Sequence, residues 1–186
     1  LNEGIVRVGV SETALHEVLL PALVKYHALY PKIKFSLINL TNAQAIGAVK
    51  NQAVDFALIA TPFDEDKTLK TVTIKTFQDI VVCGKRYKYL TSEKVGFEEI
   101  LKHCVISLNK TTRTYEYYFN LFRKRGLVFS PDIEVSTSNQ ILPIVKNNLG
   151  IGFIPESFAE KEIADSEVFK LETEEEIAPR EICLIK

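Results

Sequence analysis

The stretch that decides the fold is GIVRVGVSETALHEVLLPALVKYHALYPKIKFSLINL, residues 4–40. It begins with an apolar run, Ile5 to Val10, that is typical of a buried strand. An amphipathic helical pattern runs from Leu15 to Tyr30, and Pro31 prevents that helix from continuing. A second apolar run starts at Ile33. Strand, helix and strand in this order predict two parallel strands joined by a crossover helix.

The pattern continues with a helical stripe from Ala45 to Ala53 and an apolar strand from Val54 to Ala60, which completes βαβαβ and hence a parallel sheet. A second unit then follows, and the last strand of the chain returns to the first unit. The predicted strands of the second unit are residues 79–83, 104–108, 133–136, 151–154 and 168–171, and the last strand is 181–185. We therefore expect two lobes, joined by two crossings near residues 76–82 and 172–181.

Short polar clusters follow several of these strands and start the next helix. The clusters are Ser11 to Thr13, Thr41 with Asn42, Asn109 to Thr112, and Ser136 to Asn139. In an open α/β sheet such residues lie at the carboxyl ends of strands, where helix N-termini offer N–H groups to a ligand. Polar caps in both halves of the chain predict a cleft for a small polar molecule.

Composition indicates an ordinary globular protein. The chain has 186 residues, 46% of them hydrophobic, and 23 basic against 24 acidic residues give a net charge of −1. Such a balance provides no overall field that attracts nucleic acid. No uncharged stretch is apolar over the about 18 residues that a membrane span needs, and no signal peptide opens the chain. Cys83, Cys104 and Cys183 are far apart among apolar neighbours, as expected of reduced cysteines in a cytoplasmic protein.

The chain contains no Met and begins at Leu1 directly before a strand. We expect it to be a piece of a longer translation product.

Four stretches carry a resemblance to a known family: the opening strand, Leu19 to Leu37, VDFALIATP at residues 54–62, and IVKNNLGIGFIP at residues 144–155. In this order and spacing the chain resembles the effector-binding domain of LysR-type transcriptional regulators over nearly its whole length. It departs from the family in having Asn148 where Gly is usual, and in lacking the family's C-terminal helix.

The resemblance implies an α/β, two-lobed fold like that of type II periplasmic binding proteins, with two Rossmann-like lobes joined by two crossing strands. Lobe I is expected to comprise residues 1–78 plus 177–186, and lobe II residues 79–176. The implied function is ligand sensing in a cytoplasmic regulator. A small effector would bind between the lobes, and the effector would alter the lobe angle and the geometry of a homodimer, or of a tetramer in the full-length protein. DNA would be bound only by an N-terminal domain outside this chain.

The resemblance also implies which residues contact the effector. They are Ser11, Thr13, Thr41, Asn42, Thr61, Asn109, Thr111, Thr112 and Ser138. The alternative is that these residues only cap helices, and a cap and a ligand contact can coexist.

Nearby charges bear on the class of effector. Lys110 and Arg113 favour an anion, whereas Glu12 would repel an anion or attract an amino group. A carboxylate or an amino acid is therefore expected. No cofactor or metal site is predicted.

Two other functions are alternatives to this one. A transport-linked solute-binding protein of the same architecture would explain the cleft equally well. An enzyme would need a reactive group, and the sequence offers only His103 beside Cys104. Neighbours on a strand point to opposite faces, so core packing is favoured for this pair and no enzymatic activity is expected.

Overall fold

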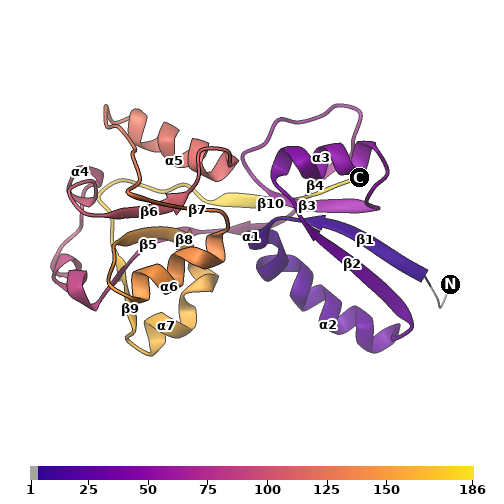
Figure 1. Ribbon diagram of the computed structural model, residues 1–186, viewed down its shortest axis with the longest axis horizontal. Helices are drawn as coiled ribbons and strands as arrows, with labels where there is room; N and C mark the ends of the chain where they lie inside the picture. Colours follow the sequence, from indigo (N-terminus) through magenta and orange to yellow (C-terminus); the bar gives the residue numbers. More distant parts are fainter. Residues whose placement is uncertain (1–3) are drawn as a thin grey trace. The chain divides into compact units, whose positions relative to one another are not determined.

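The computed structural model describes residues 4–186, which divide into two compact units (Figure 1). The first extends to Phe77 and takes up the chain again from Arg180 to Lys186, and the second comprises Gln78–Pro179. Each unit is a five-stranded sheet with helices on both faces. The predicted two-lobed α/β class is confirmed by this architecture.

The first sheet has the strand order β2-β1-β3-β10-β4. The strands β1, β2 and β3 are parallel, as the βαβαβ pattern predicts, and β10 is antiparallel to both β3 and β4. The elements are β1 (Gly4–Val10), α1 (Glu12–Ala14), η1 (Leu15–Leu19), α2 (Leu20–Leu29), β2 (Ile33–Asn39), α3 (Asn42–Lys50), β3 (Phe56–Ala60), β4 (Thr71–Phe77) and β10 (Arg180–Ile185).

Two apolar layers enclose this sheet. One face packs Val8 and Val10 against Leu19 and its helical neighbours, and the other packs Ala57 and Ile59 against α3 (Figure 1). The middle of the sheet, around β3, is therefore buried between the two layers, whereas β2 and β4 at its sides are largely exposed.

The first helix differs from the single regular helix predicted from Leu15 to Tyr30. It begins at Glu12, passes through a π-helical turn at η1, and ends at Leu29. Pro21 has no N–H to donate to the Glu17 carbonyl, and Lys75 Nζ donates to that oxygen at 3.3 Å instead. Lys75 also pairs with the Glu17 carboxylate at 2.6 Å. A lysine distant in sequence thus donates a hydrogen bond to the Glu17 carbonyl, to which Pro21 cannot donate.

The second sheet has the order β7-β6-β8-β5-β9, with β6 parallel to β7 and β8 and with β5 antiparallel to β8 and β9. Its elements are β5 (Asp79–Gly84), η2 (Lys85–Ser92), α4 (Phe97–Ile100), β6 (Val105–Leu108), α5 (Arg113–Arg123), β7 (Ile133–Val135), η3 (Ser138–Gln140), α6 (Ile141–Lys146), β8 (Ile151–Pro155), η4 (Glu156–Phe158), α7 (Glu160–Ala164) and β9 (Val168–Leu171).

The aromatic residues of α5 dominate one face of this sheet. Phe122 is fully buried and stacks on Phe97 with ring centroids 4.4 Å apart. Tyr118 is also buried, and its hydroxyl donates to Asp79 Oδ2 at 2.6 Å. The other face is covered by α6 and α7 (Figure 1).

The unit boundaries differ slightly from the lobe boundaries expected from the sequence, which gave residues 78 and 177–179 to lobe I. Gln78 Nε2 donates to the carbonyls of Asp79 and Ile177, and Ile177 is buried in the core of the second unit. These contacts hold both segments to the second sheet.

Local turn chemistry follows the sequence closely. Thr41 and Gln44 form a capping box, and Thr137 with Gln140 forms another, as a Thr followed three residues later by Gln favours. Asn148 has a φ of 60°, a left-handed conformation after a helix that Asn tolerates better than most non-Gly residues.

No helix within residues 4–186 has both the length and the apolar character that crossing a membrane requires.

Gly150 enters β8 at a point where the backbone of another strand passes closely. A Cβ placed on Gly150 would lie 2.3 Å from the carbonyl oxygen of Cys104, the same oxygen that accepts the Ile151 N–H at 2.8 Å. The glycine is thus required by the close approach of backbone to backbone.

We expect Gly150→Ala to lower the free energy of unfolding by about 2 kcal/mol, because the methyl group meets backbone that cannot move aside. The matched control is Gly47→Ala in α3, where a Cβ meets nothing within 4 Å. That variant should be stabilised by roughly 0.5 kcal/mol. Urea denaturation measures both values, and equal midpoints for the two variants would contradict the explanation.

Candidate functional site

The predicted residues of the first unit gather at one edge of its sheet. Because β1 lies between β2 and β3, and all three strands are parallel, their carboxyl ends are adjacent. Ser11 follows β1, Thr41 lies just after β2, and Thr61 follows β3. We call this the first polar edge, and it also carries Thr13 and Asn42.

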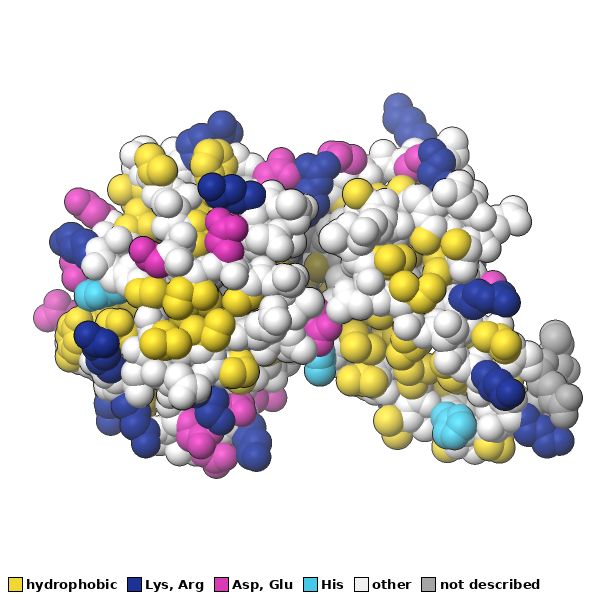
Figure 2. Space-filling view, in the orientation of Figure 1, with side chains coloured by type: hydrophobic (Ala, Val, Ile, Leu, Met, Phe, Trp, Pro, Cys, Tyr) yellow, Lys and Arg dark blue, Asp and Glu magenta, His cyan; other side chains and the backbone are white. Residues whose placement is uncertain are grey.

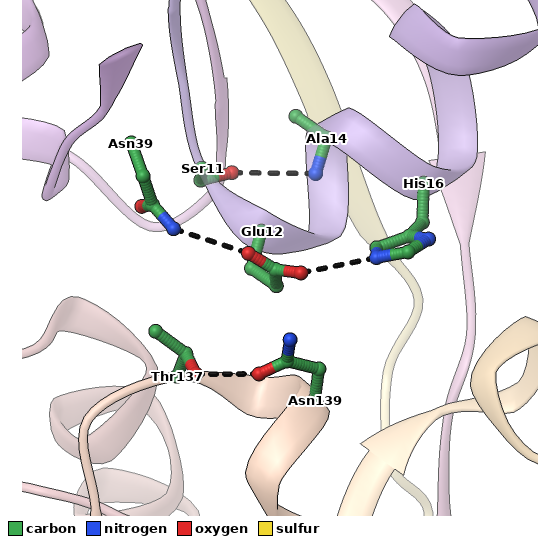
Figure 3. Close-up of polar contacts among 7 residues, drawn as sticks. All are labelled: Ser11, Glu12, Ala14, His16, Asn39, Thr137 and Asn139. Carbon is green, nitrogen blue, oxygen red and sulfur yellow. Dashed lines mark hydrogen bonds and ion pairs between the residues drawn. The ribbon is translucent and has the colours of Figure 1, made fainter. Parts of the chain in front are cut away.

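Ser11 and Thr13 begin the first helix. Ser11 Oγ accepts the Ala14 N–H at 3.3 Å (Figure 3). The Ser11 N–H donates to the carbonyl of Leu58 at 3.0 Å. Thr13 is 8% exposed. Ser11 therefore acts as a helix cap, and this role is compatible with a ligand contact.

Asn42 holds the turn that follows β3. Its Nδ2 donates to the carbonyls of Ala60 at 2.8 Å and Pro62 at 3.0 Å. The side-chain amide that was predicted to contact an effector thus has both donor hydrogens engaged by the protein. Its principal role is to brace this turn.

Thr61 is also engaged structurally. Its N–H donates to the carbonyl of Glu181 at 2.8 Å, and its Oγ1 accepts the Glu181 N–H at 3.0 Å. Its carbonyl accepts from Nε of Arg180, a side chain only 4% exposed. Thr61 thereby joins β3 to β10.

Glu12 lies on the same edge with two polar neighbours (Figure 3). Its Oε2 accepts from Asn39 Nδ2 at 3.1 Å, and its Oε1 lies 3.0 Å from His16 Nε2. Sequence reasoning singled out Glu12 but not Asn39 or His16. The position of Asn39 at the end of β2 was the signal that could have found it.

The second unit has a corresponding edge where β6 and β7 end. Asn109 follows β6 and forms a turn, in which its Oδ1 accepts from the N–H and the hydroxyl of Thr111 at 3.1 and 2.5 Å. Thr112 Oγ1 donates to the Asn109 carbonyl and accepts the Tyr115 N–H at 3.1 Å. Thr112 is thus the N-cap of α5.

Ser138 follows β7 at this edge of the second unit, which we call the second polar edge. It is 8% exposed. Beside it the Thr137 hydroxyl donates to Asn139 Oδ1 at 2.5 Å (Figure 3). Gln140 Oε1 accepts the N–H groups of Ser136 and Thr137 at 2.9 and 3.1 Å. The turn is therefore ordered by its own side chains before any ligand binds.

Two cations stand by the second polar edge. Lys110 is exposed, and Arg113 Nη1 lies 2.5 Å from Glu116 Oε2 in the first turn of α5. Glu116 offsets much of the Arg113 charge, so Lys110 is the stronger attraction for an anion.

The cysteines do not resemble nucleophiles. Burial raises the pKa of Cys83 to about 11, and burial with the nearby Asp132 carboxylate raises the pKa of Cys104. A raised pKa keeps a thiol protonated and unreactive at neutral pH. His103 lies near Glu99 Oε1, at 3.4 Å, and against the rings of Tyr87 and Tyr89. The geometry favours packing for both residues.

The relatives of the chain agree with this architecture. It is 25% identical over 175 residues to an uncharacterized HTH-type transcriptional regulator of Bacillus subtilis, YoaU, covering 83% of this chain and 51% of that protein. The chain thus spans about half the length of the curated relatives it matches.

Solved structures show the same fold. The regulatory domain of CcmR from Synechocystis, in complex with 2-PG, aligns with a TM-score of 0.84 at 19% identity, over 99% of this chain and 88% of that one. The effector-binding domain of QuiR, in complex with shikimate, aligns with a TM-score of 0.80 at 18% identity, over 99% and 87%.

The family described as the LysR substrate binding domain matches residues 1–186. With two α/β units whose parallel strands end in polar helix starts, and with a family match over its whole length, this chain belongs to the substrate-binding domains of LysR-type regulators.

Proposed function

We propose that this domain senses a small polar effector for a LysR-type transcriptional regulator, and that both polar edges contact the effector. One observation carries the proposal. In each unit, parallel strands end beside one another, and the residues that follow them have hydroxyl and amide side chains. Domains of the same fold bind 2-PG in CcmR and shikimate in QuiR, both of them small polar molecules.

The effector acts by its differential affinity for two arrangements of the domain. A ligand that binds one arrangement more tightly shifts the population toward it, and that shift is the signal. In the whole regulator the signal passes to an N-terminal DNA-binding domain. That N-terminal domain binds the DNA, and the whole regulator acts in the cytoplasm.

The family membership favours this role over the alternative of a transport-linked solute-binding protein, since both curated relatives are transcriptional regulators. The family consists of regulatory domains, and the raised pKa values of the cysteines give no support to a catalytic role.

Within this function the effector is a carboxylate or an amino acid. Lys110 and the N–H groups at the start of α5 suit a carboxylate, because anions are stabilised at a helix N-terminus. Glu12 on the first polar edge suits an amino group.

Thr13 and Ser138 give the sharpest test of the site, because neither side chain is the N-cap of a helix in its own unit. We expect Thr13→Val and Ser138→Ala each to weaken effector binding about threefold to tenfold, the loss of one hydrogen bond. Candidate effectors are first found by a thermal-shift screen of small carboxylates and amino acids, and affinities are then measured by calorimetry.

The control for this test is Ser36→Ala, an exposed hydroxyl on β2 away from the polar edges, which should bind as the wild type does. Loss of affinity in only one of the two variants Thr13→Val and Ser138→Ala would show that a single edge binds the effector.

We further propose that the domain forms a homodimer through α2, with the first unit of one copy against the second unit of its partner. None of the residues of α2 is buried, and Val24 and Leu29 are each 73% exposed. Apolar side chains gather over α2 and β2 in Figure 2. A hollow of 330 Å³ opens there, lined by Val6, Leu19, Ala22, Leu23, Tyr26, Phe35 and Phe56. An apolar surface of this kind marks an interaction site.

Val24→Asp should convert the dimer to a monomer, because the carboxylate would be buried without a partner at the interface. Analytical ultracentrifugation checks the mass, and circular dichroism checks that the fold is kept. Ile74→Asp is the control and should remain dimeric, because Ile74 is 46% exposed on β4, at the opposite edge of the first sheet from β2. A wild-type protein that stays monomeric at high concentration would contradict the proposal.

A further inference from the structure

Glu12 is held over the first polar edge by residues from two elements. Asn39 Nδ2, at the end of β2, donates to Oε2 at 3.1 Å, and His16 Nε2, one helical turn along, lies 3.0 Å from Oε1 (Figure 3). The Glu12 side chain is 13% exposed. A carboxylate in this state has a fixed position and little contact with water.

Glu12 differs from two other carboxylates of the same unit in the kind of group that is paired with it. Glu17 pairs with Lys75 Nζ at 2.6 Å, and Asp66 pairs with Lys50 Nζ at 2.7 Å. Among the ion pairs recorded within residues 4–186, Glu12 has neither a lysine nor an arginine, and its second neighbour is a neutral amide.

A structural role alone does not account for this arrangement. An acidic residue in the first turn of a helix is stabilised by the helix dipole, but it has no need of an asparagine from a neighbouring strand. A carboxylate accepts about four hydrogen bonds, and Glu12 uses two of them. Asn39 and His16 therefore fix the direction of the carboxylate and leave acceptor capacity for a third donor.

We infer that Glu12 is the specificity-determining residue of the effector site and that it selects effectors carrying a protonated amino group. The inference rests on the proposed effector function of the first polar edge. An ammonium group supplies a further N–H donor and a permanent positive charge, and none of the ion pairs recorded within residues 4–186 gives Glu12 a lysine or an arginine. An anionic group at the same point would face like-charge repulsion and lose affinity.

A metal ion is a poorer occupant. Within the part of the chain that the structure describes, no group of three His, Cys, Asp or Glu residues is arranged to hold one.

The test is a thermal-shift and calorimetric comparison of amino acids with their des-amino counterparts, such as alanine with propionate, glutamate with glutarate, and phenylalanine with 3-phenylpropionate. The wild-type domain should bind an amino compound at least tenfold more tightly than its des-amino counterpart. Glu12→Gln keeps the side chain's size and an acceptor oxygen, and it should remove that preference by weakening only the amino compound.

Glu160→Gln is the matched control, because Glu160 is also an acidic residue in the first turn of a helix, is exposed, and lies in the second unit. It should bind every compound as the wild type does. Asn39→Ala should lower the affinity for the amino compound less than Glu12→Gln does, since it releases the carboxylate without removing its charge.

Two results would overturn the inference while leaving the proposed function in place. One is equal wild-type affinity for amino and des-amino compounds. The other is binding of an amino compound that weakens in Thr13→Val and Ser138→Ala but not in Glu12→Gln. If neither these compounds nor a broad library of metabolites stabilises the domain, the proposed effector function itself fails, and this inference fails with it.

Discussion

The parallel pairing of β1 with β2 on one side and β3 on the other is the constraint on which the first unit depends. Parallel strands end at the same edge, so the residues that follow them meet there although they are distant in sequence. Ser11, Thr41 and Thr61 are brought together in this way. In the second unit β6 is placed between β7 and β8, and the same logic brings Asn109 near Ser138.

Most polar side chains at these edges already have a structural role. Asn42 braces the turn after β3, Thr61 fastens β3 to β10, and Thr112 caps α5. These bonds order the turns in advance, and a ligand that meets ordered donors loses less conformational entropy on binding. We propose that selectivity depends on side chains with remaining hydrogen-bonding capacity, of which Glu12 is a charged example.

Charge acts locally in this domain. Its net charge of −1 gives no overall field, so attraction of an effector must come from single groups near the strand ends. The second polar edge carries two cations, Lys110 and Arg113, and Arg113 is paired with Glu116. At the first, Glu12 meets an amide and an imidazole. The charged groups at the two edges therefore differ in sign, which supports the proposal of an effector that is a carboxylate or an amino acid.

The sequence by itself determined the order of strands and helices, both capping boxes, the left-handed Asn148 and the strand-end position of the predicted site residues. These features depend on interactions over a few residues, so local pattern and cap chemistry suffice to predict them. The strand pattern also indicated two lobes, and the family resemblance then implied that they are arranged as in type II periplasmic binding proteins.

Only the tertiary structure decided the rest. In the folded protein β10 lies between β3 and β4, and Lys75 donates to the Glu17 carbonyl, to which Pro21 cannot donate. Asn39 lies beside Glu12, 27 residues away in the sequence. The Asn42 amide, which the resemblance implied as a ligand contact, donates to the carbonyls of Ala60 and Pro62. Each of these contacts joins segments far apart in sequence. Their formation depends on the register and packing of whole elements, because a side chain finds a distant partner only after the sheet has brought the two together.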